Sequence, residues 1–131
     1  MALLNLLGLF AALGLLALAT FALRRGRSRI GPLAGDPVAR ILGLLAADLA
    51  VWNLATVLFH WTGEPAWHWL DVTFSPLTPP LVLHLVTTWV GVARRARPWL
   101  LAAYVAFGAL ALSSPKSLRG LPWMPCPANK W

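Results

Sequence analysis

The sequence is poor in charge, and above all in acidic residues. Only 11% of its 131 residues are charged, and the sequence has four Asp or Glu residues against eleven Lys or Arg residues. Ordinary soluble domains carry about a quarter of their residues as ionic side chains, so a soluble globule is excluded. The single cysteine, Cys126, excludes an intrachain disulfide framework. The chain also lacks a nucleophile with a base in motif spacing, a phosphate loop and a cysteine pair, so the sequence predicts no enzyme.

Apolar residues make up 59% of the chain and fall in blocks too long for the core elements of a soluble protein. We therefore predict an all-α integral membrane protein whose membrane domain covers residues 1–114. Its four transmembrane helices are expected at about residues 2–23, 38–59, 71–93 and 98–114. The first block would extend about 33 Å, enough to cross the hydrocarbon core. A cleaved signal peptide is the alternative, but no basic residue precedes this block.

Basic residues separate the apolar blocks unevenly. The connections after the first and third blocks are rich in arginine, whereas the connection between the second and third, His60–Leu70, has neither Lys nor Arg. The positive-inside rule then places both termini outside a bacterial cytoplasmic membrane. The residues that carry this orientation are Arg24, Arg25, Arg27, Arg29, Arg94, Arg95 and Arg97.

The net charge of +7 lies between apolar blocks and not on a folded face, so nucleic-acid binding is not expected.

Residues at the ends of the apolar blocks predict a helix cap, a tail and membrane anchors. Asp36 is placed to cap the second helix. Residues 115–131 are expected to form an extended, Pro- and Trp-rich tail on the outer side. Tryptophans favour the membrane interface, and we predict anchors at Trp61, Trp67, Trp69, Trp89 and Trp99.

Prolines mark the entry of the third block. Pro76, Pro79 and Pro80 remove backbone donors, and the carbonyls they leave unpaired cannot face lipid, so this end must pack against protein. The 14 residues from Pro80 to Ala93 would extend only about 21 Å, so the proline-bearing part must also enter the membrane. The sequence predicts a kinked third helix.

Asp48 lies in the middle of the second block, where a carboxylate costs about 2.5 to 3.5 kcal/mol. One interpretation is a proton or ion site. The alternative is a carboxyl that accepts hydrogen bonds between helices, from Asn53, Thr56 or another subunit. The residues expected to form the polar, helix-packing core are Asp48, Trp52, Asn53, Thr56, Pro79 and Pro80.

Three histidines are candidates for ligands. His84, inside the third block, could ligate a haem or a chlorophyll-type pigment, or could be a hydrogen-bonded packing residue. His60, Glu64 and His68 have spacings that would suit a metal site on one helical face. Gly63 and Pro65 argue against a helix there, so no metal is predicted.

The second and third blocks resemble the membrane input module of bacterial seven-helix sensor histidine kinases. The matching residues are Trp52 and Asn53, then Pro79, Pro80, Leu81, Leu83 and His84. The resemblance implies a sensory module, but it covers only the first four helices, roughly Met1 to Ser114, and no transmitter follows them in this sequence.

Three functions fit these observations. The first is a non-catalytic accessory subunit that contacts other integral membrane proteins and lipids, for example in a photosynthetic or respiratory assembly. The second is a sensory module that acts with a separate signalling protein and binds a small apolar molecule near Asn53 and His84. The third is a pigment- or haem-binding subunit that uses His84; apart from that possibility, no cofactor is predicted.

Overall fold

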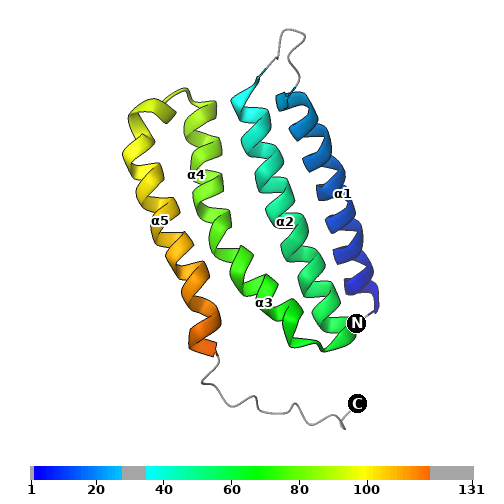
Figure 1. Cartoon of the computed structure of the whole chain (residues 1–131). Helices are drawn as coiled ribbons and strands as arrows, with labels where there is room; N and C mark the ends of the chain where they lie inside the picture. Colours follow the sequence, from blue (N-terminus) through cyan, green and yellow to red (C-terminus); the bar gives the residue numbers. More distant parts are fainter. Residues whose placement is uncertain (1, 28–34, 119–131) are drawn as a thin grey trace.

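The computed structural model describes residues 2–27 and 35–118, with side chains for 5–26 and 35–113. These residues form five α-helices and one 3₁₀ turn, and contain no strand (Figure 1). Three helices include a segment long and apolar enough to cross a membrane: Asn5–Gly26, Pro37–Thr62 and Ala93–Ser113. The prediction of an all-helical chain of membrane type is therefore confirmed.

Helix α2 (Pro37–Thr62) begins and ends at recognisable signals. The Asp36 carboxylate accepts a hydrogen bond of 2.9 Å from the Val38 N–H, which confirms the predicted cap. At the other end Gly63 adopts φ 66°, and its N–H donates to the Phe59 carbonyl over 2.8 Å. The helix consequently continues beyond Phe59, where the sequence analysis ended it.

Helix α1 (Ala2–Arg27) packs along α2 through small residues. A Cβ built on Gly43 would lie 2.7 Å from Leu23 Cγ and 3.1 Å from the Leu23 backbone nitrogen, so the two helices approach closely there. Small residues permit such close approach between helices in lipid. Other buried small residues of this pair are Ala12, Ala19, Ala22, Ala46 and Ala50.

A side-chain bond also joins the two helices at their loop end. Arg40, in the first turn of α2, donates from Nε to the Gly26 carbonyl of α1 over 2.7 Å. The last carbonyls of a helix lack partners and carry partial negative charge, so a guanidinium is favourable there. The bond fixes the start of α2 against the end of α1.

The next helical path is broken at its prolines. It comprises α3 (Pro65–Phe74), the 3₁₀ turn η1 (Ser75–Leu77) and α4 (Thr78–Trp89), and Figure 1 shows it bending between α3 and α4. Pro79 has no N–H to donate to the Ser75 carbonyl. The Thr78 N–H donates to that carbonyl instead, which gives the 3₁₀ geometry. The break lies where the prolines predict it.

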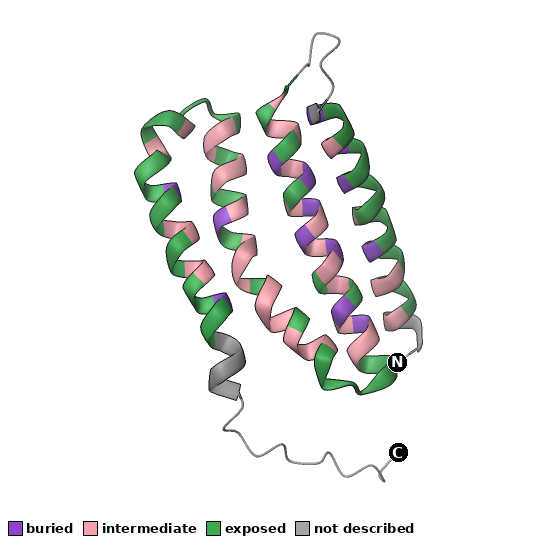
Figure 2. Ribbon diagram, viewed as in Figure 1, coloured by how far each residue is buried: buried purple, intermediate pink, exposed green. Residues whose placement is uncertain are grey.

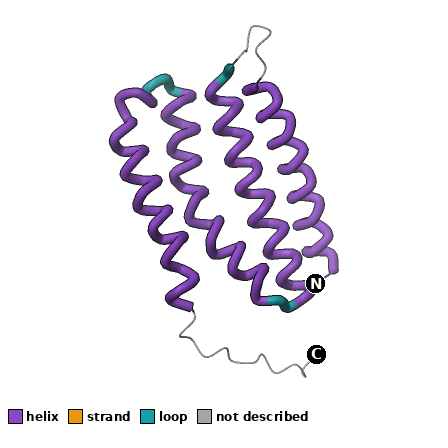
Figure 3. Tube along the Cα trace, in the orientation of Figure 1, coloured by secondary structure: helices purple, strands orange, loops and turns teal. Residues whose placement is uncertain are grey.

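The expectation of a non-helical loop over residues 60–70 is wrong. The connection between α2 and α3 is short (Figure 3), because Pro65 stands in the first turn of α3. Proline is favourable there, since the first helical N–H groups have no partner within the helix. The third helical path therefore begins at Pro65 and not at residue 71.

The last helix is longer than predicted at both ends. α4 ends at Trp89, a turn with Gly91 at φ 80° follows, and α5 (Ala93–Leu118) begins five residues before Pro98. Arg94, Arg95 and Arg97 thus belong to its first turns and not to a loop. The helix also includes residues 115–118, which were assigned to the extended tail; residues 119–131 lie outside the described part.

The helices form a single row and not a closed bundle. α1 packs on α2, α2 packs on α3 and α4, and α5 packs on α3, η1 and α4, so that α1 and α5 lie at opposite edges (Figure 1). Buried residues are concentrated in α2, in the interior of the row (Figure 2). The edge helices carry exposed apolar side chains, among them Phe10, Phe21, Val105 and Leu112.

Candidate functional site

Asp48 is the most deeply buried ionisable side chain among the described residues, with 5% of its surface exposed. Its Oδ2 accepts a hydrogen bond of 2.7 Å from the Thr78 hydroxyl. Thr78 is the first residue of α4, directly after the proline-containing 3₁₀ turn, so the helix break sets the position of the donor. The second carboxylate oxygen, Oδ1, is buried and has no partner among the described residues.

Asp48 accepts a bond from another helix, as one interpretation expected, but neither of the two donors named for it, Asn53 and Thr56, supplies that bond. The Asn53 side-chain amide donates to the Leu49 carbonyl over 2.8 Å, and the Thr56 hydroxyl donates to the Trp52 carbonyl over 3.0 Å. Both side chains therefore bond within α2, as polar residues of membrane helices commonly do. The donor to Asp48 comes instead from another helix, 30 residues further along the chain.

A mostly apolar concavity of about 280 Å³ lies between α1 and α2, near the start of α1; we call it the polar concavity for the Asn, Thr and His side chains in its lining. At its rim, the His60 Nδ1 lies 2.7 Å from the Thr56 carbonyl oxygen. Because a carbonyl only accepts, Nδ1 is the donor in this contact, and Nε2 is the ring nitrogen left without a bond from the described residues. The residues lining this concavity are Asn5, Gly8, Trp52, Asn53, Thr56, Val57 and His60.

An apolar groove of about 610 Å³ adjoins it, between α2 and α4. Pro79 contributes an exposed face to this groove, whereas Pro80 is fully buried in the protein. Trp52, which is 39% exposed, lines both hollows. The groove is formed by Trp52, Ser75, Thr78, Pro79, Val82, Leu83 and Val86.

His84 joins α4 to α5. Its Nδ1 lies 3.1 Å from the Tyr104 hydroxyl oxygen, and the two rings meet edge to face with centroids 5.9 Å apart. Tyr104, the single tyrosine of the sequence, was not predicted as a partner of His84. This pair fits two roles for His84. It fits a hydrogen-bonded packing histidine, and it also fits a ligating histidine, because a hydroxyl bonded to Nδ1 would orient Nε2 toward a ligand.

The described residues contain no group of three or more His, Cys, Asp or Glu side chains that could hold a metal ion. His60 lies in the last turn of α2 and His68 lies on α3, and the Phe59 ring packs against both imidazoles, with centroids 6.0 and 5.4 Å away. Glu64 is the residue before α3. A further acid, Asp71 of α3, has a buried Oδ1 with no partner in the described part.

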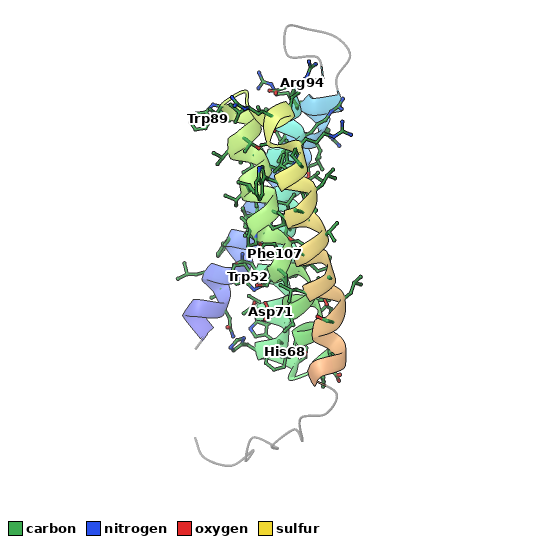
Figure 4. All side chains as sticks on the ribbon, turned by 90° about the vertical axis from the view of Figure 1, so that its left-hand side faces the viewer. Trp52, His68, Asp71, Trp89, Arg94 and Phe107 are labelled. Atoms are coloured by element: carbon green, nitrogen blue, oxygen red, sulfur yellow. The ribbon has the colours of Figure 1, made fainter. Side chains whose placement is uncertain are left out.

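The predicted tryptophan anchors lie near the two ends of the helices, along the direction of the helix axes. Trp61 (54% exposed) ends α2, and Trp67 and Trp69 lie half-buried on α3. Trp89 and Trp99, 77% and 75% exposed, lie near the opposite end, where α4 meets α5. Figure 4 shows this separation, with Trp89 and Arg94 at one end and His68 at the other.

Arginines gather at the Trp89 end, although they come from distant parts of the sequence. Arg24 and Arg25 close α1, Arg40 begins α2, and Arg94, Arg95 and Arg97 begin α5. The Arg25 guanidinium lies 5.7 Å from the centroid of the Phe21 ring. Arg27 is the last residue of α1, and Arg29 lies outside the described residues.

Comparisons with protein-family models, curated proteins and solved structures return no match. The resemblance to sensor-kinase input modules therefore depends on the short motifs alone. Of its residues, Trp52 and Pro79 meet at the apolar groove, whereas His84 faces α5.

Proposed function

We propose that this chain crosses a bacterial cytoplasmic membrane four times, and that α3, η1 and α4 together make the third crossing. At about 1.5 Å per residue, Pro65–Trp89 would extend about 37 Å, longer than the hydrocarbon core even with a bend. The fully buried Pro80 supports this assignment, because the proline-broken backbone packs against protein there.

The same proposal places both termini outside. Its support is the distribution of charge along the helix axes. The described arginines lie at one end of the helices, whereas His60, Glu64 and Asp71 lie toward the other end. The positive-inside rule makes the arginine end cytoplasmic. The tryptophans at both ends fit the two interfaces of a bilayer.

We propose that the protein acts as a non-catalytic accessory subunit of a larger membrane complex, for example a photosynthetic or respiratory one. The observation that carries this proposal is the open row of helices. In a closed four-helix bundle each helix has two neighbours, but among the described residues α1 packs mainly on α2, and α5 packs mainly on the α3–α4 path. Val105 and Leu112 of α5 remain 71% and 76% exposed. Both edges are therefore available for side-on contact with other membrane helices.

Copurification tests this proposal. The tagged chain is extracted from its native membranes in a mild detergent, and its mass is measured by size exclusion with light scattering before mass spectrometry. We expect other integral membrane proteins in fixed stoichiometry. A stable monomer, or an assembly made only of this chain, would contradict the subunit assignment.

A second candidate is a sensory module that acts with a separate signalling protein. It is favoured by the two hollows that meet at Trp52, since mostly apolar clefts with a few polar groups are typical ligand sites. Binding of a small molecule by the isolated chain, in the absence of any partner protein, would favour this candidate over the first.

Pigment or haem binding through His84 is the third candidate. The contact between its Nδ1 and the Tyr104 hydroxyl is the feature in its favour, because ligating histidines usually bond an outer partner through the other nitrogen. Protein purified from native membranes would then show a visible absorption band that His84→Leu removes. Colourless protein would exclude it.

A further inference from the structure

The polar concavity and the apolar groove adjoin at one residue. The concavity lies between α1 and α2 and the groove between α2 and α4, and Trp52 lines both. Along α2, His60 lies about 12 Å from Trp52, and along α4, Val86 lies about 12 Å beyond Thr78. His60 and Val86 thus lie at the far ends of two neighbouring hollows, and the hollow at His60 has the larger share of polar side chains.

The polar part presents hydrogen-bond acceptors beside the side-chain amide of Asn5, which can also donate. His60 donates Nδ1–H to the Thr56 carbonyl, so Nε2 is the ring nitrogen open to a ligand, and it accepts a hydrogen bond when the ring is neutral. Asn53 donates through its amide nitrogen to Leu49, and its Oδ1 accepts no bond from the described residues. Acceptors at the membrane interface are complementary to a group that donates hydrogen bonds, such as a hydroxyl.

The charge of the site narrows the choice of head group. No charged side chain lines either hollow, and the described arginines lie at the ends of the helices away from His60. An anionic phospholipid head would therefore find no cation beside His60, and it would be attracted to the arginine end instead. An uncharged head fits the polar part best.

The apolar part suits a single long chain. Val82, Leu83 and Val86 of α4 are between 41% and 47% exposed along the groove. The groove is open along its side and hence able to receive a chain from the surrounding lipid.

We propose that this face binds one membrane amphiphile with an uncharged, hydroxyl-bearing head and a single long apolar chain. The head lies at Asn53 and His60, and the chain runs past Trp52 along α4 to Val86. This inference gives a ligand class to the sensory candidate, and it requires the membrane placement but no partner protein.

Binding of octadecanol to the full-length chain tests the proposal, with stearic acid as the charged comparator of equal chain length. Native mass spectrometry of protein released from detergent micelles counts the bound molecules at each concentration. We expect one saturable site for octadecanol and at least about tenfold weaker binding of stearic acid at neutral pH. Non-saturable uptake, or stearic acid bound as tightly as octadecanol, would overturn the proposal.

Substitutions locate the site. Val82→Trp should fill the groove and weaken octadecanol binding at least about tenfold, whereas Leu54→Trp is the matched control. Both positions are 41% exposed, but Leu54 lines a separate apolar hollow between α1 and α2. Asn53→Leu and His60→Phe should each weaken binding about two- to tenfold, the value of one hydrogen bond.

Circular dichroism of each variant checks that the helices are retained. If Val82→Trp loses helix content, the smaller Val82→Phe is used in its place. Equal effects of the two tryptophan substitutions, or full binding by both head-site variants, would contradict the assigned position. These results leave copurification unaffected, so the amphiphile site and the subunit assignment can fail separately.

Discussion

Replacing Thr78 by valine should destabilise the protein by about 1 to 3 kcal/mol. The substitution keeps the shape of the side chain but removes the hydroxyl that donates to Asp48 Oδ2 over 2.7 Å. Because Oδ1 already lacks a partner, the buried carboxyl would then have none on either oxygen. An unsatisfied buried polar group costs about 1 to 3 kcal/mol, more than the net value of the bond it lost.

The second half of the prediction concerns the double variant. With Asp48→Leu in the same chain, both partners are apolar and no buried group is left unpaired, so most of the loss should be recovered. We expect a coupling energy of at least about 1 kcal/mol between the two substitutions. This coupling separates a specific bond from a general effect of valine at the start of α4.

The assay is unfolding in mixed micelles, with helix content followed by circular dichroism as denaturing detergent is added. Thr20→Val is the matched control, because the Thr20 hydroxyl bonds only the Leu16 carbonyl of its own helix, at an exposed position. It should change stability by less than about 0.5 kcal/mol. A Thr78→Val variant as stable as the native protein, or a double variant no more stable than Thr78→Val alone, would refute the reasoning.

Three further outcomes follow from the helix packing and the charge distribution. Gly43→Ala should destabilise the protein by about 1 to 3 kcal/mol in the same unfolding assay, because its Cβ would lie 2.7 Å from Leu23 Cγ of α1. Gly14→Ala is the control: its Cβ would have nothing within 4 Å, so the substitution should be neutral or slightly stabilising. Arg40→Met should cost about 1 to 2 kcal/mol, since it removes the donor to the end of α1; no measurable loss would mean that the bond is not formed. In variants without the native cysteine, a membrane-impermeant maleimide added to whole cells should label Glu64→Cys but not Arg94→Cys; the reverse pattern would invert the proposed orientation.

The apolar blocks predicted the helical class and the approximate positions of α1 and α2, because about twenty apolar residues in succession leave few alternatives. The ends were less accurate. His60 and Trp61 were assigned to the connection after the second block, but the glycine that ends α2 comes only at position 63. Pro65 was treated as a helix breaker, although in the first turn it favours a helix.

The partners of the buried polar residues could not be predicted from spacing. Within one helix, turn geometry relates Asp48 to its neighbours, and that reasoning suggested Asn53 and Thr56. Its actual donor, Thr78, depends on how far α4 is shifted along α2, and the 3₁₀ turn fixes that shift. The pairing of His84 with Tyr104 likewise depends on how α5 lies against α4.

The close packing of α1 on α2 has a consequence for biogenesis. The glycine and alanine contacts between these helices, and the Arg40 bond that joins them, all lie within the first 62 residues of the chain. Neither depends on any later segment, so this hairpin is complete as soon as Thr62 has entered the bilayer. The later helices would then be inserted beside a preassembled template, and a released, membrane-inserted fragment ending just after Gly63 should already resist protease over both helices.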